Sequence, residues 1–361
     1  MMKLMKKKVG IVRSLMILAW VVIVSLIVFA SRLQFFKPER SITVLAWSAA
    51  FDRAYVKKFE KETGIRVHLS TYSTNEELLV KLQSSKGKDY DLIVPSDYVI
   101  ARLKNEGLLK KLDKNKLSFL DQLNPLLLGF SFDPKNEYTI PLVWDVFCIG
   151  YDTNKIDPSR IVSPWDLVFT RFNHHAGYRI VMTNDPLEAI SFATQYLFGP
   201  VSSLSPEQIK EVESLLKNQK AWVENYTNLR GDYLLGSGAV DAAIMQSAEI
   251  WRALAAFKHL DFVIPHDALI SIEHCAIPVG SEKESLVYEF LNFFYTRDAF
   301  INNYREAFNF PARMDVIDAL PVTDRQRAVM RSSPEEFKRY SFIRDLLPER
   351  KRFDLWVAVK S

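Results

Sequence analysis

The stretch ITVLAWSAAFDRAYVKKFEKETGIRVHLSTYSTNEELLVKLQSSKGKDYDLIVPSDY, residues 42–98, decides the fold. Short β-branched and apolar runs within it predict three strands, at 42–45, 65–69 and 91–95. Helical segments lie between the strands. The first ends at Gly64, and the second begins with the capping-box sequence at 74–77. This alternation of strands and helices predicts an open α/β sheet.

Polar and aromatic side chains directly follow two of these strands. Trp47 and Ser48 follow the first strand, and Ser96 and Tyr98 follow the third. In open α/β sheets, ligands bind beyond the carboxyl ends of the strands, so we expect these residues in a ligand site. Structural roles are the alternatives: a tryptophan at a strand end is commonly a core residue, and Ser96 can cap the next helix.

Length and composition indicate a globular protein with no attraction to nucleic acid. The chain has 361 residues, enough for two sizeable cores, with 48% hydrophobic and 25% charged residues. The net charge of +4 arises from five basic residues among the first thirty, where there is no acid. Without these five, 42 basic residues remain against 43 acidic ones, so no basic patch is expected.

The first thirty residues are typical of an export signal. Basic residues precede an apolar run at 15–30, which ends in the small-residue context VFA at 28–30. An uncleaved signal anchor is the alternative, although a spanning helix needs about 20 residues. No cysteine follows the run, so no lipid anchor is expected there. In both cases the globular part lies outside the cytoplasm, in the periplasm.

The remaining chain predicts a second α/β set and two crossings between lobes. We expect one lobe at 41–147 with 276–318, and a second lobe at 148–275 with 319–361, joined by strands that cross at 146–150 and 273–278. A cleft between lobes joined in this way opens and closes by hinge motion. Cys148 and Cys275 fall one in each crossing. They predict either a disulfide that tethers the hinge or two buried thiols.

Several motifs resemble a known family. They are Trp47, FEKETGI at 59–65, STYSTNE at 70–76, YDLIVPSDY at 90–98, IP at 140–141, Trp144, IG at 149–150 and AIP at 276–278. Together they resemble the spermidine/putrescine-binding proteins of bacterial ABC importers, which are two-lobed periplasmic binding proteins of the type II-like fold. The resemblance spans residues 41 to about 320 and becomes generic in the last forty residues.

The resemblance implies a monomeric binding protein that takes no cofactor, closes on a polyamine and delivers it to ABC permease subunits. Matching ligand positions are Trp47, Ser96, Tyr98, Asp185 and Glu188, and Glu273 stands where the family has an aspartate. Gln246 and Phe310 occupy positions where the family has a tryptophan and a tyrosine. Other ring positions are lost at Ala50 and Ser271, and Ala49 replaces an acid.

A polyamine requires carboxylates near its ammonium groups and aromatic faces along its methylene chain. Cation–π contacts contribute about 0.5–2 kcal/mol each, and hydrogen bonds to charged groups about 1.5–3 kcal/mol. Glu273 is the most informative residue, because a carboxylate in an apolar crossing strand is costly without a cationic partner. Asp185 and Glu188 have a structural alternative, since DPLE at 185–188 is also a good helix start.

The missing aromatic residues leave alternatives open. The ligand is then a shorter diamine, another small organic cation or another solute, or the chain is a non-transport scaffold on the same fold. An enzyme is not expected, because the sequence has no HExxH, P-loop, nucleophile-elbow or dinucleotide motif. Under the enzyme alternative, Asp185 and Glu188 would act as an acid–base pair.

Overall fold

The computed structural model describes residues 16, 18–21, 40–48, 50–172, 177–228 and 230–361. Most of the predicted export signal at residues 1–30, and all of Ala49, lie outside the described residues. Among the residues that are described, no helix is both long enough and apolar enough to cross a membrane.

The decisive stretch forms one parallel sheet with its helices, as predicted. Strand β1 pairs in parallel with β2 on one side and with β3 on the other. Parallel pairing is possible because one helix connects β1 to β2 and another connects β2 to β3. The elements are β1 (Ser41–Ala46), α2 (Arg53–Thr63), β2 (Arg66–Thr71), α3 (Asn75–Ser85), β3 (Leu92–Ile93) and α4 (Asp97–Asn105).

The ends of these helices follow the local sequence with one difference. The backbone at Gly64 has φ +69°, the left-handed conformation that ends α2. Thr74 caps α3 by accepting a hydrogen bond from the Glu77 amide at 3.2 Å. The expected capping box is incomplete, because Glu77 accepts from the Ser73 amide at 2.9 Å and not from Thr74.

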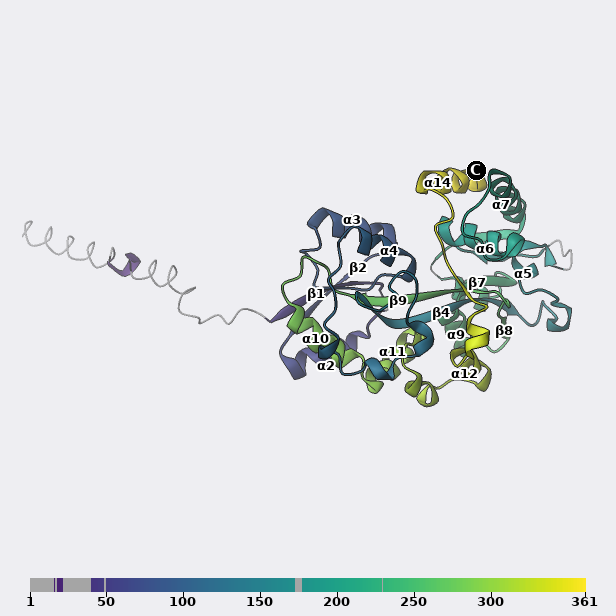
Figure 1. The fold of residues 1–361 in the computed structure, drawn as a ribbon. Coiled ribbons are helices and arrows are strands. Elements are labelled where there is room, and N and C mark those ends of the chain that lie inside the picture. Colours follow the sequence, from purple (N-terminus) through teal and green to yellow (C-terminus); the bar gives the residue numbers. More distant parts are fainter. Residues whose placement is uncertain (1–15, 17, 22–39, 49, 173–176, 229) are drawn as a thin grey trace, which may run out of the picture.

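Two long strands join the two lobes, which lie left and right in Figure 1. They are β4 (Thr139–Asp152) and β9 (Leu269–Ala276), and they pair antiparallel from Thr139–Ala276 to Val146–Ile270. From Phe147 onward β4 pairs instead with β7 (Ala242–Gln246), and from Ile149 also with β8 (Leu260–Val263). One strand therefore belongs to the sheets of both lobes, which confirms the two-lobed α/β architecture. The exact limits predicted for the lobes remain a prediction.

The other elements cover the sheets or continue them at the edges. The second lobe contains α5 (Asp166–Phe169), β5 (Ile180–Met182), α6 (Pro186–Phe198), α7 (Pro206–Gln219), β6 (Val223–Tyr226), α8 (Gly231–Gly236) and α9 (Ser247–Ala256). The chain returns through α10 (Glu284–Phe294), α11 (Arg297–Ala307) and β10 (Phe310–Pro311). It ends with α12 (Asp324–Met330), α13 (Pro334–Phe337), β11 (Ser341–Phe342) and α14 (Glu349–Lys360).

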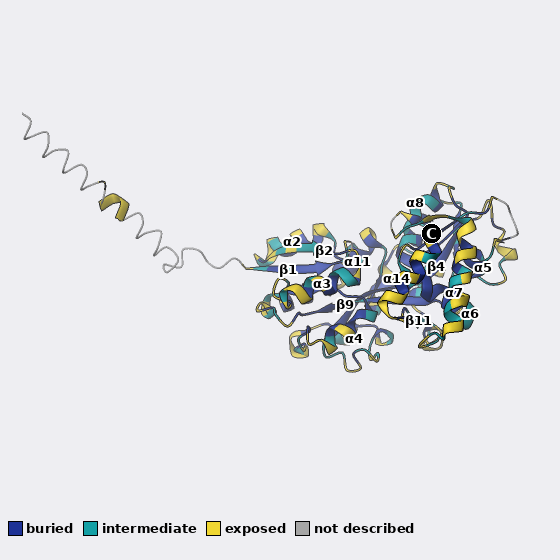
Figure 2. Ribbon diagram, turned by 90° about the horizontal axis from the view of Figure 1, so that it is seen from above, coloured by how far each residue is buried: buried dark blue, intermediate teal, exposed yellow. Residues whose placement is uncertain are grey.

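The apolar core continues from one lobe into the other. Most strands lie in the buried interior, and the exposed residues lie mainly on helices and loops (Figure 2). At the junction the Phe310 ring lies 4.9 Å from Trp144 and 4.4 Å from Trp251, measured between ring centroids. Phe310 has no exposed surface. Phe310 was expected in the ligand site, but the structure places its side chain in the apolar core.

The disulfide alternative for the two cysteines is wrong in this structure. Cys148 and Cys275 are both free and buried. The strands do run side by side, but Cys275 lies opposite Ile140, whereas Cys148 lies opposite Met245. Eight positions along β4 separate Ile140 from Cys148, a distance of about 26 Å at ~3.3 Å per residue. A disulfide requires Cα atoms within about 7 Å, so the register excludes it.

We predict two free thiols per chain when the unreduced protein is unfolded and titrated with a thiol reagent. In the folded protein both should react slowly, because burial raises the pKa of Cys275 to about 12 and that of Cys148 well above its usual value. A reduced sample is the control and should give the same count. Fewer than two thiols in the unreduced, unfolded chain would contradict the register.

Candidate functional site

Glu273 lies where the strand ends of the first lobe meet the crossing strand β9. Its carboxylate accepts a hydrogen bond from Trp47 Nε1 at 2.7 Å and another from Ser96 Oγ at 2.8 Å. Trp47 directly follows β1, and Ser96 stands between β3 and α4. The structure thus brings together three of the predicted site residues from three separate segments of the chain.

The Glu273 carboxylate is half-buried, and no charged partner for it is found among the described residues. Among the described residues, no lysine or arginine forms an ion pair with it. Burial raises its pKa to about 7, while the hydrogen bonds from Ser96 and Trp47 act in the opposite direction. This is the chemistry expected of an acid that receives a cation from outside the chain.

Ser96 does not play its alternative role as a helix cap. It occupies the N-cap position of α4, but its side chain accepts no hydrogen bond from the helix backbone. The hydroxyl donates to Glu273 instead and accepts from Asn75 Nδ2 at 3.0 Å. The hydroxyl therefore serves the carboxylate and not the helix.

Asn75 is a site residue that sequence reasoning missed. Its amide nitrogen donates both to Ser96 Oγ and to Tyr98 Oη, at 3.0 and 2.9 Å. A hydrogen-bond network therefore runs from Trp47 through Glu273, Ser96 and Asn75 to Tyr98. The sequence signal was an asparagine inside the capping-box motif, where only the flanking threonine and glutamates had an assigned role.

Tyr72 is a second missed residue. Its ring centroid lies 4.4 Å from that of Trp47, and its hydroxyl donates to the carbonyl of Val94 at 2.5 Å. It therefore holds the Trp47 ring next to the strand ends and supplies an aromatic face that the predicted site lacked.

Asp185 and Glu188 lie at the N-terminus of α6 in the second lobe. Asp185 caps the helix, with Oδ1 accepting from the amides of Leu187 at 2.7 Å and Glu188 at 3.3 Å. The helix-start role is thus confirmed for Asp185. Glu188 does not reach back to the cap. It accepts from Thr183 Oγ1 at 2.6 Å.

Both of these acids resist ionisation. Burial, and then the neighbouring charge of Asp185, raise the pKa of Glu188 to about 8. Burial also raises the pKa of Asp185, although hydrogen bonds from the helix backbone and the positive charge of Arg352 partly offset it. Glu188 thus resembles Glu273, whereas Asp185 already lies in the field of a cation.

Tyr98 lies between the hydrogen-bond network of the first lobe and the acids of the second lobe. It packs against the apolar clusters of both lobes. Burial and the nearby charges of Glu76, Asp185 and Glu188 raise its pKa above the usual value. The candidate site is therefore continuous across the junction, from Glu273 to Glu188.

Three further acids near this junction were also missed, of which Asp97 and Asp145 are buried and Glu249 is half-buried. Asp97 accepts from the Ile272 amide at 2.7 Å, and burial raises its pKa well above the usual value. Asp145 accepts from Ser247 Oγ at 2.6 Å, and burial raises its pKa to about 6. Burial also raises the pKa of Glu249 to about 7. Asp145 interrupts an apolar strand as Glu273 does, so the reasoning applied to Glu273 would have found it.

The remaining predicted residues lie at the edge of this arrangement. Ser48 is exposed. Gln246 ends β7, and its Nε2 lies 3.4 Å from Ser271 Oγ, so the two polar replacements for the family's tryptophans contact one another. With Phe310 in the core, the aromatic rings that contact the Glu273 network are those of Trp47, Tyr72 and Tyr98 among the residues described above.

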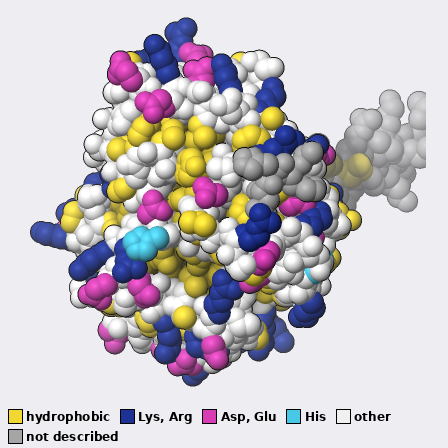
Figure 3. Space-filling model, turned by 90° about the vertical axis from the view of Figure 1, so that its right-hand side faces the viewer, with side chains coloured by type: hydrophobic (Ala, Val, Ile, Leu, Met, Phe, Trp, Pro, Cys, Tyr) yellow, Lys and Arg dark blue, Asp and Glu magenta, His cyan; other side chains and the backbone are white. Residues whose placement is uncertain are grey.

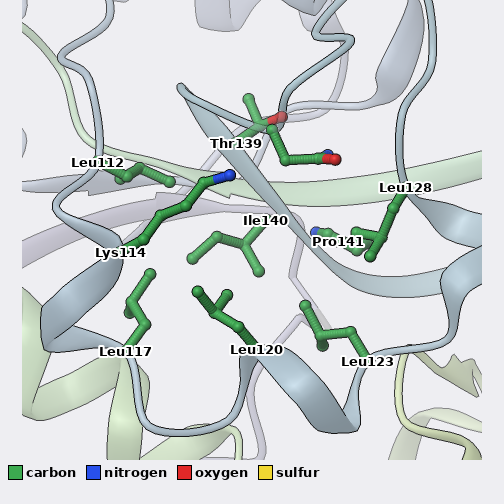
Figure 4. A pocket seen from close by; sticks show the side chains of 10 residues that line it. Leu112, Lys114, Leu117, Leu120, Leu123, Leu128, Thr139, Ile140 and Pro141 are labelled. Carbon is green, nitrogen blue, oxygen red and sulfur yellow. The ribbon is translucent and has the colours of Figure 1, made fainter.

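A separate apolar cavity lies in the first lobe, away from these acids. It has a volume of about 100 Å³ and is lined by five leucines and by Lys114, Asn136, Thr139, Ile140 and Pro141 (Figure 4). None of the carboxylates described above lines it. The cavity is therefore separate from the acid cluster, and its charged lining residue is a lysine.

Comparison with known proteins identifies the family. The model of the bacterial extracellular solute-binding proteins matches residues 54–328. The chain is 30% identical over 257 residues to the spermidine/putrescine-binding periplasmic protein of Salmonella typhimurium, covering 70% of this chain and 72% of that protein. It is 30% identical over 270 residues to the putrescine-binding periplasmic protein SpuD of Pseudomonas aeruginosa, covering 71% and 73%.

Solved structures agree in fold. The substrate-binding protein PotD of the Streptococcus pneumoniae spermidine/putrescine ABC transporter superposes with a TM-score of 0.74 at 22% identity, covering 89% of this chain and 98% of that one. The TpPotD lipoprotein of Treponema pallidum gives a TM-score of 0.75 at 21% identity, covering 88% and 99%. With its two-lobed fold and its extensive match to the family model, the chain belongs to the bacterial extracellular solute-binding proteins.

Proposed function

We propose that this protein binds a polyamine, putrescine or spermidine, outside the cytoplasm and delivers it to the permease subunits of an ABC importer. The observation that carries the proposal is the pair of half-buried carboxylates, Glu273 and Glu188, neither of which has an ion-pair partner among the described side chains. Each is stabilised in its charged form if a ligand ammonium group arrives. The names of the two relatives described above support the same ligand class.

The two acids lie on different lobes, which gives hinge closure a physical basis. Glu273 is tied to the first lobe through Trp47 and Ser96, whereas Glu188 belongs to α6 of the second lobe. A diammonium ligand that contacts both acids stabilises the closed arrangement more than the open one. Ligand binding then shifts the equilibrium between the open and closed conformations toward the closed one.

The rest of the surface supports a small cationic ligand and not a macromolecular polyanion. On the face of the second lobe in Figure 3, lysine and arginine side chains are interspersed with aspartate and glutamate. This mixture agrees with the near balance of charge in the chain after its first thirty residues. We propose that the protein acts as a monomer in the periplasm.

A second candidate is a binding protein for a shorter diamine or another small organic cation. The contact between Gln246 and Ser271 favours it, because these residues replace rings that would line a longer methylene chain. The acids are retained under this alternative, so the charge requirement of the ligand is unchanged.

We predict that putrescine produces a binding heat in calorimetry, and that Glu273→Gln and Glu188→Gln each weaken it by about tenfold or more. Each change leaves a ligand ammonium group without its buried charged partner. Glutamine keeps an oxygen that accepts from Trp47 and Ser96, or from Thr183, so the folds should persist. Glu62→Gln, at an exposed position of α2, is the matched control and should bind like the original protein. Absence of heat with putrescine, cadaverine and spermidine would contradict the proposal.

We predict that the ligand-free protein becomes less stable as the pH rises from about 6.5 to 8. In this window the folded state retains protons on Glu273 and Glu188, with pKa values of about 7 and 8, that the unfolded chain has already lost. Each such group contributes a slope of at most ~1.4 kcal/mol per pH unit. Buried His274, whose pKa is lowered to about 4, makes its opposite contribution below this window.

Thermal unfolding at several pH values should therefore show a flatter profile for the double variant Glu188→Gln/Glu273→Gln. Some slope should remain, because Glu249 titrates near pH 7 as well. Putrescine should bind with release of protons near pH 7, measured by calorimetry in two buffers of different ionisation enthalpy. Identical slopes for the original and double-variant proteins would show that these acids are already ionised.

A further inference from the structure

The C-terminal helix places a cation against the acid cluster. Helix α14 lies beyond the residues matched by the family model and packs against α6 and α7. The chain between β11 and α14 runs past the junction of the lobes before the helix begins (Figure 1). The buried residues of α14 are Arg352, Leu355, Trp356 and Val359, whose spacing places them on one face of the helix. An arginine therefore stands on the face that is otherwise apolar.

Arg352 contacts acids from both lobes. Its side chain is 6% exposed, with Nη1 at 2.5 Å from Asp345 Oδ1 and Nη2 at 3.4 Å from Glu76 Oε1. Glu76 belongs to α3 of the first lobe. In the second lobe, burial raises the pKa of Asp185, and the positive charge of Arg352 partly opposes that rise. The buried Nε of Arg352 has no hydrogen-bond partner among the described residues.

The acids of the junction therefore fall into two groups. Arg352 forms ion pairs with Asp345 and Glu76 and lies in electrostatic reach of Asp185. Glu188 and Glu273 have no ion-pair partner among the described residues. A ligand ammonium group is attracted to Glu188 and Glu273, whereas at the Asp185 end the guanidinium already offsets part of the negative charge and repels a further cation.

We propose that Arg352 is a specificity-determining residue that limits the number of positive charges the ligand can carry, by acting as a built-in cation at the Asp185 end of the site. The proposal rests on the proposed function and narrows it. A dication whose charges meet Glu188 and Glu273 is accepted. A trication, such as spermidine, has a third charge that must compete with Arg352.

The test compares the affinities of putrescine and spermidine by calorimetry for the original protein and for Arg352→Gln, at one pH and ionic strength. We expect Arg352→Gln to raise the spermidine affinity relative to that of putrescine by about tenfold or more. Arg352→Lys, which keeps the charge, and Lys351→Gln, which removes an exposed charge from the same helix, should keep the original ratio.

The variant is expected to fold, because Glu76 and Asp345 are 34% and 61% exposed and water can solvate them. If thermal unfolding shows that Arg352→Gln is not folded, Arg352→Met removes the same charge and keeps an apolar stem on the buried helix face.

The outcomes separate the two proposals. If the original protein binds putrescine and the ratio in the variant stays within about threefold, the role of Arg352 is overturned and the proposed function stands. If Arg352→Gln binds spermidine and the original protein does not, the role of Arg352 is supported. If neither protein binds any polyamine, the proposed function fails and the role of Arg352 fails with it.

Discussion

The structure depends on one interaction, a half-buried carboxylate held by neutral donors. Glu273 accepts hydrogen bonds from Trp47 and Ser96 but has no ion-pair partner among the described residues. Two hydrogen bonds offset only part of the free energy needed to bury a charge. The site therefore remains incomplete until a cation binds or a proton is taken up, and both outcomes restore neutrality.

The crossing strands explain why so many acids gather at one place. Strand β4 belongs to the sheets of both lobes, and β9 runs beside it, so residues on these strands lie at the junction whatever their distance in sequence. Asp145 on β4 and Glu273 on β9 are the acids that these strands contribute. The ends of β3 and β5 face the same junction, which places Ser96 and the start of α6 beside them. Chain topology thus brings acids from separate segments together at one place.

Local sequence signals predicted most of the fold and part of the site. Strand and helix patterns in residues 42–98 gave the parallel sheet, and Glu273 was found because a charge within an apolar strand demands an explanation. Asp145 escaped because the crossing was expected to begin at residue 146, one position after it, whereas the strand runs from Thr139 to Asp152.

Other residues could not be found from local patterns. Asn75 and Tyr72 act only through contacts with residues more than twenty positions away. The Ser96 hydroxyl donates to Glu273, 177 positions away, and does not cap the helix that follows it. Arg352 is 167 positions from Asp185 in the sequence, and only the fold brings the two near each other. The cysteines are free because of the strand register, which their spacing in the sequence does not reveal.

The aromatic rings between the lobes also constrain how the halves move. Trp144, Phe310 and Trp251 form an unbroken apolar column through the junction. Pulling the column apart would expose ring faces to water, at about 25 cal/mol for each Å² uncovered, whereas rotation about it keeps the faces in contact. We therefore expect the hinge to turn about these three rings, with the torsion taken up along β4, so that the ring contacts persist while the lobes open and close.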